Sequence, residues 1–251
     1  MKEYPFIHWN GGTVRLLVRE IDGYSDATKI VGGMNHLDYN GYMCAITQDE
    51  YGFKDMNLRR GDVVVDIGAY NGGEGIELGL LGLDIKTFSY DPIQENLDLY
   101  KTNVDRLGIK GITMYRKAVG AEKGTIKMWL PSKDPMHVGI ASTLPEDKWH
   151  KDNPISIGDV EMTTLEDILK DNGIEKCAVL KLDCEGPEAE ILHTAPRHIL
   201  EKIDWIVGET HILNRKELLE PIKDLFNDVP CKKQEENGLG EFMYKRKGCN
   251  R

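Results

Sequence analysis

The sequence predicts an α/β protein with a doubly wound, mainly parallel sheet of seven strands, an antiparallel hairpin at the C-terminal end and an N-terminal extension. Two observations carry this prediction. Residues 63–67 form a run rich in β-branched side chains, typical of a strand buried on both faces of a parallel sheet, and the run turns through glycines into an apolar helical segment. From Gly61 onward, strands and helices alternate, as they do in Rossmann-like folds.

The other elements of the main domain follow in order. Further strands are expected at 85–90, 112–116, 124–130, 177–182 and 203–208. Helices are expected over 76–81, over 93–107, from Thr163 or Thr164 to 169, after Pro187, and over 216–226 with an interruption near Pro221. A final hairpin is expected to pair 232–235 with 241–245 through the glycine-rich turn 237–240.

The chain divides into an extension, residues 1–55, and a main domain, residues 56–251. The extension contains a predicted strand at 13–21, and it either covers the ligand or serves only as a structural cap. Residues 131–160 hold several prolines and little periodicity, which predicts a long loop on the substrate side of the domain.

Composition describes an ordinary globular protein, with 40% hydrophobic and 29% charged residues. The net charge of −10 argues against a nucleic-acid partner, because such proteins gain most of their affinity by neutralising phosphates. No apolar stretch is long enough for a membrane span, and no signal peptide is recognisable. Five scattered cysteines without a C-x-x-C pair indicate reduced thiols, so we expect a cytoplasmic protein. Nothing in the sequence indicates an oligomeric state.

The glycine-rich turn after the first strand predicts a cofactor site. Gly68 and Gly72 allow the backbone to approach a ligand closely and aim free helix N–H groups at it. Asp66 places a carboxylate beside this turn, which suits a cationic ligand such as S-adenosylmethionine better than a pyrophosphate. Asp91 follows the next strand, about 20 residues later, where nucleotide-binding folds place the acid that contacts the ribose hydroxyls.

Carboxylates also follow two later strands. Asp183 and Glu185 come after strand 177–182, and Glu209 and His211 come after strand 203–208. Because the carboxyl ends of parallel strands meet at one edge of a sheet, these side chains are candidates for a reaction centre. Asp183 and Glu185 could instead cap the following helix, and His211 could be an ordinary surface histidine. Asp183 and Glu209 could together hold magnesium, but the ligand set is small and no metal site is predicted.

Several of these motifs together resemble the FkbM methyltransferases, a family of S-adenosylmethionine-dependent enzymes that mostly methylate hydroxyl groups. The resemblance covers roughly residues 55–215 and rests on segments 61–69, Tyr90-Asp91-Pro92 and, above all, Leu180 to Glu188 with its lysine–aliphatic–aspartate–x–glutamate–glycine signature. Glu209-Thr210-His211 and Ala141-Ser142-Thr143 resemble two further family segments. This chain departs from the family at Tyr70-Asn71-Gly72, where Asn-Ile-Gly is common, and at Asp91, where glutamate is common.

The resemblance implies roles for particular residues. It implies a class I methyltransferase domain that binds S-adenosylmethionine through Asp66, Gly68, Ala69, Tyr70, Asn71, Gly72, Asp91, Pro92, Lys117, Ala118 and Asp183. Lys117-Ala118 would form the adenine edge. An alcohol needs a base to receive its proton, for which Asp183, Glu209 and His211 are candidates. Ser142 and Glu185 are expected to contact the acceptor, a hydroxyl-bearing small molecule, sugar, or lipid- or polyketide-like compound.

Two other functions remain open on the sequence. A glycine turn followed by an acid also occurs in NAD(P)-dependent oxidoreductases, although the spacing around Gly68 departs from G-x-G-x-x-G. A domain that binds S-adenosylmethionine without turnover is also compatible with the motifs, since the proposed base is a position and not a diagnostic sequence.

Overall fold

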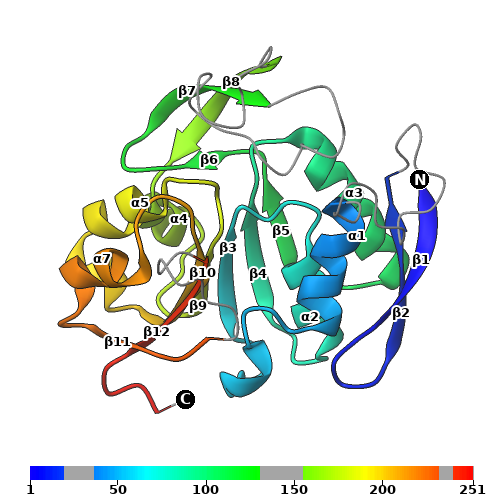
Figure 1. Cartoon of the computed structure of the whole chain (residues 1–251), viewed down its shortest axis with the longest axis horizontal. Helices are drawn as coiled ribbons and strands as arrows, with labels where there is room; N and C mark the ends of the chain where they lie inside the picture. Colours follow the sequence, from blue (N-terminus) through cyan, green and yellow to red (C-terminus); the bar gives the residue numbers. More distant parts are fainter. Residues whose placement is uncertain (20–36, 131–154, 232–239, 251) are drawn as a thin grey trace.

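The computed structural model of the chain describes residues 1–19, 37–130, 155–231 and 240–250. Its centre is a seven-stranded sheet with the strand order β11-β12-β10-β9-β3-β4-β5 (Figure 1). Five neighbouring strands run parallel, and β12 runs antiparallel between β10 and β11. The strands are β3 Val63–Ile67, β4 Lys86–Tyr90, β5 Ile112–Tyr115, β9 Cys177–Leu182, β10 Ile203–Thr210, β11 Phe226–Asp228 and β12 Gly240–Arg246. The predicted fold class is therefore confirmed.

Helices cover both faces of the sheet. In Figure 1, α1, α2 and α3 lie on one side of the strands, and α4, α5 and α7 lie on the other. The described helices are α1 Leu37–Tyr42, α2 Gly73–Leu80, α3 Gln94–Leu107, α4 Leu165–Asp171, α5 Glu188–Thr194, α6 Arg197–Leu200 and α7 Arg215–Leu219. Thr164 accepts a hydrogen bond from Asp167 N and caps α4, which resolves the alternative between Thr163 and Thr164.

The central strands are rich in apolar residues because both of their faces are buried. Within β3, Val65 packs with α4 and α5 in one core cluster, whereas its neighbour Val64 packs in another with Leu78 of α2. Successive side chains of a strand point to opposite faces, so an uninterrupted apolar run fills both cores. The β-branched run that predicts β3 thus has a direct physical cause.

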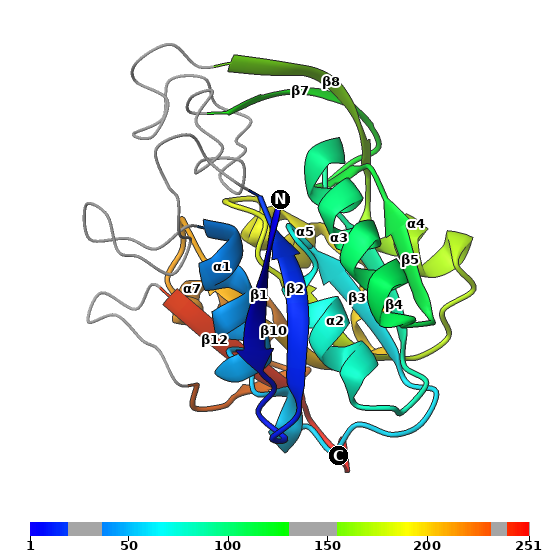
Figure 2. The same ribbon diagram turned by 90° about the vertical axis from the view of Figure 1, so that its right-hand side faces the viewer.

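The N-terminal extension is built around a hairpin of β1 Lys2–Ile7 and β2 Thr13–Val18. It lies beside α1 and α2 (Figure 2). Its buried aromatic side chains, with Tyr42, share a core cluster with Ile76 of α2 and Tyr100 of α3. Only β2 corresponds to the predicted strand 13–21, and the extension packs on the main domain as predicted.

A second, smaller sheet stands above the strand ends (Figures 1 and 2). It has the order β6-β8-β7, with β6 Ala118–Val119, β7 Gly124–Leu130 and β8 Ile155–Thr163. Strand β7 confirms the predicted strand 124–130. The expected loop 131–160 is wrong for 155–160, because Ile155–Val160 pair with β7 as part of β8. Val160 is buried against Met128 and Ile93, which explains why this stretch is ordered into a strand.

One prediction at the C-terminal end is also wrong in part. The interruption near Pro221 is confirmed, because α7 stops at Leu219 and a short 3-10 helix, Glu220–Ile222, follows, but Phe226 begins β11 and does not continue the helix. At the edge of the sheet β12 pairs with β11, and β12 confirms the predicted strand 241–245. Phe226 is buried in the main core, which favours the strand over a continued helix. Residues 232–239, with the expected turn, lie outside the described residues.

Within residues 1–19, 37–130, 155–231 and 240–250, no helix has the length and apolar character needed to cross a membrane. Ser142 and its neighbours Ala141 and Thr143 also lie outside the described residues, so their expected contact with the acceptor stays a prediction. The division into an extension and a main domain likewise stays a prediction.

Candidate active site

The glycine turn after β3 lies where the strand order reverses. Strands β4 and β5 extend the sheet to one side of β3, and β9 and β10 extend it to the other, so the end of β3 lies beside the end of β9. This reversal is the point at which open α/β sheets bind ligands. A Cβ on Gly68 would lie 1.7 Å from the carbonyl oxygen of Asp183, and Gly68 has a φ of 77°. Only glycine allows this contact between the turn and Asp183.

The rest of the turn is tied to the N-terminal extension. Tyr70 adopts a left-handed backbone conformation (φ 47°), and its hydroxyl donates to Asp38 Oδ1 at 2.7 Å. Asn71 Nδ2 donates to the carbonyl oxygen of Asp38 at 3.0 Å. Arg19 of the extension forms a buried ion pair with the same Asp38 carboxylate at 2.6 Å. Tyr70 and Asn71, where the turn departs from the family pattern, thus connect the turn to α1.

Asp91 lies beside this turn at the end of β4. Its Oδ2 accepts from Tyr70 N at 2.9 Å, and its Oδ1 accepts from Ile93 N at 2.8 Å. Burial raises the pKa of Asp91 to about 6, although these amide bonds favour the ionised form. Because a carboxylate offers about four acceptor sites, the side chain retains capacity for a further donor such as a ribose hydroxyl. Its contact with the ribose stays a prediction.

Lys181 of β9 stabilises the glycine turn through a hydrogen bond and an ion pair. Its Nζ donates to the carbonyl oxygen of Gly68 at 2.6 Å and lies 3.3 Å from Asp66 Oδ1. The side chains of Lys181 and Asp66 are only 2% and 1% exposed. Burial lowers the pKa of Lys181, but the charges of Asp66, Glu74 and Asp183 outweigh burial and keep the ammonium protonated. Asp66 thus has a cationic partner within the protein, and its contact with a cofactor stays a prediction.

Asp183 receives a hydrogen bond from the extension. The Tyr51 hydroxyl donates to Asp183 Oδ2 at 2.9 Å, and Lys181 Nζ lies 3.8 Å from the same oxygen. The other oxygen, Oδ1, lies 3.7 Å from Nε2 of His211. The side chain of Asp183 is 27% exposed, in contrast to Asp66. One oxygen is therefore fixed by the protein, and the carboxylate is accessible to a substrate.

His211 is surrounded by carboxylates. Its Nδ1 lies 3.0 Å from Glu188 Oε1, and its Nε2 lies 3.5 Å from Glu185 Oε2. Burial by itself lowers the pKa of His211, but the hydrogen bond to Glu188 and the charges of Glu185 and Asp183 raise it to about 10. The ring is therefore an imidazolium at neutral pH in the ligand-free protein.

Glu185 is the second residue of the site with a left-handed backbone conformation (φ 62°). Such a conformation costs about 1–2 kcal/mol for a residue with a side chain and often occurs at functional positions. Burial raises the pKa of Glu185 to about 7, against the opposing effect of His211. No side-chain hydrogen bond caps α5 at its N-cap residue, Pro187, so within the described parts of the chain the helix-capping alternative for Glu185 and Asp183 has no support.

The structure brings Asp183, Glu209 and His211 together at the ends of β9 and β10. One ligand atom from each of them lies within 4.8 Å of the other two, so a modest shift of these side chains would allow them to hold a divalent cation. The two carboxylates suit magnesium or manganese, whereas the imidazole nitrogen favours a transition metal such as iron or zinc. The predicted absence of a metal site stays a prediction.

Pro92, Lys117 and Ala118 lie farther along the sheet edge, next to Asp91. Asp91 N donates to the carbonyl oxygen of Tyr115 at 3.2 Å, which brings the ends of β4 and β5 together. Lys117 pairs with Glu161 of β8 at 2.6 Å, and Ala118 is buried in β6. The assignment of Lys117 and Ala118 to an adenine edge, and of Pro92 to the cofactor, stays a prediction.

Sequence reasoning missed several residues of the site. Tyr51 belongs to the extension, and nothing in its sequence surroundings indicates a contact with Asp183. Lys181 and Glu188 are part of the family signature, and a lysine inside an otherwise apolar strand is itself a signal for a buried ion pair. Asp38 carries no signal of this kind.

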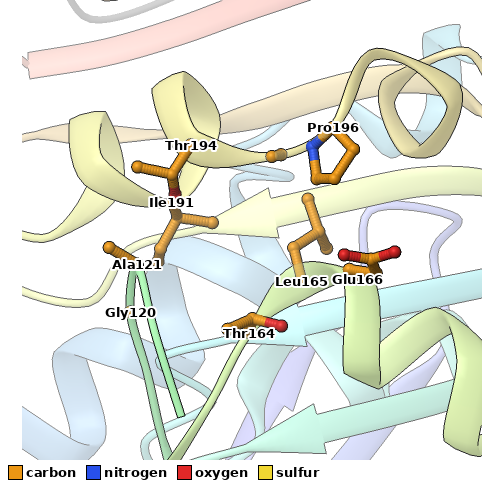
Figure 3. Close-up of a pocket in the computed structure, with 9 residues that line it drawn as sticks. Gly120, Ala121, Thr164, Leu165, Glu166, Ile191, Thr194 and Pro196 are labelled. Atoms are coloured by element: carbon orange, nitrogen blue, oxygen red, sulfur yellow. The ribbon is translucent and has the colours of Figure 1, made fainter.

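A cavity among the described residues lies elsewhere. It has a volume of about 80 Å³ and is lined by the beginning of α4, the end of α5 and the turn after β6 (Figure 3). Thr164, Glu166, Ile191 and Thr194 contribute side chains to it. The cavity contains none of the predicted site residues, and it is too small for a nucleotide cofactor.

Fold and site together define an α/β enzyme with a nucleotide-type cofactor turn at the strand reversal and a set of carboxylates beside it. The chain belongs to the FkbM methyltransferase family: the model of the methyltransferase FkbM domain matches residues 66–228, well over half of the sequence. It is accordingly an S-adenosylmethionine-dependent methyltransferase, which confirms the resemblance and the predicted cofactor. The nicotinamide-dependent oxidoreductase is thereby set aside.

Solved structures with a similar fold include other methyltransferases. An rRNA methylase from Streptococcus thermophilus is 12% identical, with a TM-score of 0.45 over 84% of this chain and 95% of that one. The precorrin 8w decarboxylase of Methanobacterium thermoautotrophicum is 16% identical, with a TM-score of 0.41 over 91% and 99%. TrmK of M. capricolum, in complex with S-adenosylhomocysteine, is 11% identical, with a TM-score of 0.43 over 76% and 65%. A search of curated proteins found no match.

Proposed function

We propose that this methyltransferase acts on a hydroxyl group of a small molecule, a sugar, or a lipid- or polyketide-like acceptor. The observation that carries the proposal is the arrangement of Asp183. One of its oxygens is held by Tyr51, the other faces His211, and its carboxylate is partly exposed at the strand reversal, next to Gly68. An alcohol is a weak nucleophile until its proton can be transferred, and a positioned carboxylate accepts that proton.

The residues present fit the cofactor. The turn at Gly68 and Gly72 has positive φ angles at both glycines and leaves no room for a Cβ at either. Bound S-adenosylmethionine supplies the methyl group, and its ammonium and sulfonium are cationic. The carboxylates at the ends of β9 and β10 match those charges, and Asp91 would accept from the ribose hydroxyls. Residues 66–72 would hold the methionine side of the cofactor.

In this mechanism a carboxylate, and not the His211 imidazole, accepts the proton of the hydroxyl group. His211 already carries its proton at neutral pH because its pKa is raised to about 10. Asp183 is better placed, since Tyr51 and Lys181 contact Oδ2 and leave Oδ1 for the acceptor hydroxyl. The His211 imidazolium then orients Asp183 and Glu185 through Nε2–H. Glu209 would bind the acceptor or serve as a second proton acceptor.

Asp91→Ala should weaken cofactor binding by about tenfold or more, because hydrogen bonds to a charged group contribute about 1.5–3 kcal/mol. Titration calorimetry of S-adenosylmethionine into the wild type and the variant measures this. Asp98→Ala, an exposed aspartate of α3, is the matched control and should bind as the wild type does. Binding that survives Asp91→Ala would refute the ribose assignment, and a wild type that does not bind would refute the cofactor site itself.

Chelation should leave activity within about twofold of its starting value, because the proposed mechanism needs only a protein carboxylate to receive the proton. The assay follows methylation of a panel of sugars, fatty alcohols and polyketide-like alcohols after dialysis against EDTA. A loss that magnesium or manganese restores would contradict this mechanism and make Asp183, Glu209 and His211 metal ligands. Cofactor binding without a methylated product across the panel would favour the non-catalytic module.

A further inference from the structure

Arg19 of the N-terminal extension places its guanidinium between two helices. Its Nε and Nη2 donate to Asp38 of α1 at 2.8 and 2.6 Å, and its Nη1 donates to Oδ1 of Asn96 in α3 at 2.9 Å. The side chain of Arg19 is 16% exposed, and both of its partners are buried. Because a guanidinium is planar and rigid, bonds to a carboxylate and an amide together fix its orientation.

Both partners of Arg19 lead to Asp91. Asn96 Nδ2 donates to Asp91 Oδ1 at 3.2 Å. On the other side, Asp38 accepts from the Tyr70 hydroxyl at 2.7 Å, and Tyr70 N donates to Asp91 Oδ2 at 2.9 Å. The guanidinium also lies over the Tyr70 ring, 5.5 Å from its centroid. The two oxygens of Asp91 are thus connected to Arg19, one through Asn96 and the other through Asp38 and Tyr70.

These contacts determine where Asp91 can accept a further hydrogen bond. The described residues supply two donors to Oδ1, which are Ile93 N and Asn96 Nδ2, and one donor to Oδ2, which is Tyr70 N. Since each carboxylate oxygen accepts about two hydrogen bonds, the remaining acceptor position is on Oδ2. A carboxylate that is already held in one orientation loses little conformational freedom when it binds a ligand.

We propose that Arg19 and Asn96 are positioning residues of the cofactor site: through them, the N-terminal extension orients the carboxylate of Asp91 toward the ribose hydroxyls of S-adenosylmethionine. The inference rests on the proposed contact of Asp91 with the ribose, and it does not depend on the acceptor or on the methyl-transfer step. It gives the extension a part in cofactor binding, beyond that of a structural cap.

A purely structural role for these contacts makes a different prediction, and α3 provides the comparison. Asn103 lies seven positions after Asn96, on the same face of the helix, and it is also buried. It binds the extension as well, because its side chain accepts from Leu17 N at 2.7 Å and donates to Leu17 O at 3.0 Å. Among the described contacts of Asn103 there is none to Asp91. If Asn96 only held the extension in place, replacing either asparagine would affect ligand binding in the same way.

The test is titration calorimetry with S-adenosylhomocysteine and with its 2′,3′-dideoxy analogue, which lacks both ribose hydroxyls. The wild type should bind S-adenosylhomocysteine about tenfold or more tightly than the analogue, because the hydroxyls donate to a charged group. Asn96→Leu and Arg19→Met, which keep most of the side-chain volume, should each reduce this preference by at least about threefold, as expected for coupling within one hydrogen-bond network.

Asn103→Leu is the matched control. It should lower stability as Asn96→Leu does, but the preference for the ribose hydroxyls should remain that of the wild type. If Asn96→Leu and Arg19→Met weaken the binding of both ligands by the same factor, the contacts are only structural and the proposal is overturned. The ribose contact would still stand in that case, provided that Asp91→Ala removes the preference.

Two further outcomes are decisive. A wild type that binds both ligands equally well would refute the ribose contact of Asp91 and, with it, the positioning role. Should Asn96→Leu fail to fold, Arg19→Lys takes its place: the ammonium can keep the ion pair with Asp38 but lacks the planar fork that reaches Asn96 at the same time. Arg19→Lys should therefore also reduce the preference, and an unchanged preference would contradict the proposal.

Discussion

Asp183→Asn should lower kcat for methyl transfer by about 10²- to 10⁴-fold, the usual contribution of a positioned proton acceptor. Asparagine has nearly the same shape, and its oxygen can still accept from the Tyr51 hydroxyl, so the local structure should persist. The amide of asparagine, however, cannot accept a proton at neutral pH. The effect should therefore fall on the chemical step and not on folding.

The measurement is S-adenosylhomocysteine release with the best acceptor of a hydroxyl panel, at saturating concentrations of both substrates. Cofactor affinity should change by only about tenfold or less, since one hydrogen bond is at stake. Asp171→Asn, an exposed change at the end of α4, serves as the control and should keep full activity. A variant Asp183→Asn that retains more than about a tenth of kcat would move the proton-accepting role to Glu209 or Glu185.

Lys181→Met should lower the free energy of unfolding by about 3–5 kcal/mol, the usual cost of removing one partner of a buried ion pair. Methionine replaces the aliphatic part of the lysine, but Asp66 would remain almost wholly buried without its cation, and the carbonyl oxygen of Gly68 would lose its donor. Replacing a lysine of an exposed ion pair lowers the free energy of unfolding far less. Lys101→Met, whose partner is Asp105 on the surface of α3, should cost less than about 1 kcal/mol.

Denaturant unfolding of both lysine variants measures their free energies of unfolding. The pH dependence of this free energy shows whether the loss of stability comes from charge or from packing. Without Lys181, the folded-state pKa of Asp66 should rise further above its unfolded value. The folded variant then binds more protons than the unfolded chain, so its stability decreases as pH rises through this window. The deficit relative to the wild type should shrink as the pH is lowered from about 7 to about 5. A deficit that does not change with pH would point to packing instead of charge.

Much of the site follows from sequence because it depends on strand ends. The ends of parallel strands meet by geometry, so the order of strands and polar residues along the chain is enough to group Asp183, Glu209 and His211. The glycine turn is equally local, because Gly68 and Gly72 adopt backbone conformations that other residues rarely adopt.

The missed features depend on contacts between distant segments. Tyr51 and Asp183 are far apart in the chain, and no periodicity or spacing links them. The sequence predicts a loop for the first half of β8 because its apolar residues alternate only weakly. Pairing with β7 and the burial of Val160 stabilise this segment as a strand. The apolar pattern around Phe226 fits a helix equally well. Phe226 lies in a strand because it pairs with the edge of β12.

The ties between the extension and the glycine turn have a consequence for engineering. Tyr70, Asp38 and Arg19 connect the turn to the first part of the chain, and Tyr51 connects the same part to Asp183. An exchange of domains between relatives that cuts near residue 55 would separate these partners. A chimera with altered acceptor preference should therefore inherit its first 55 residues and its glycine turn from the same parent.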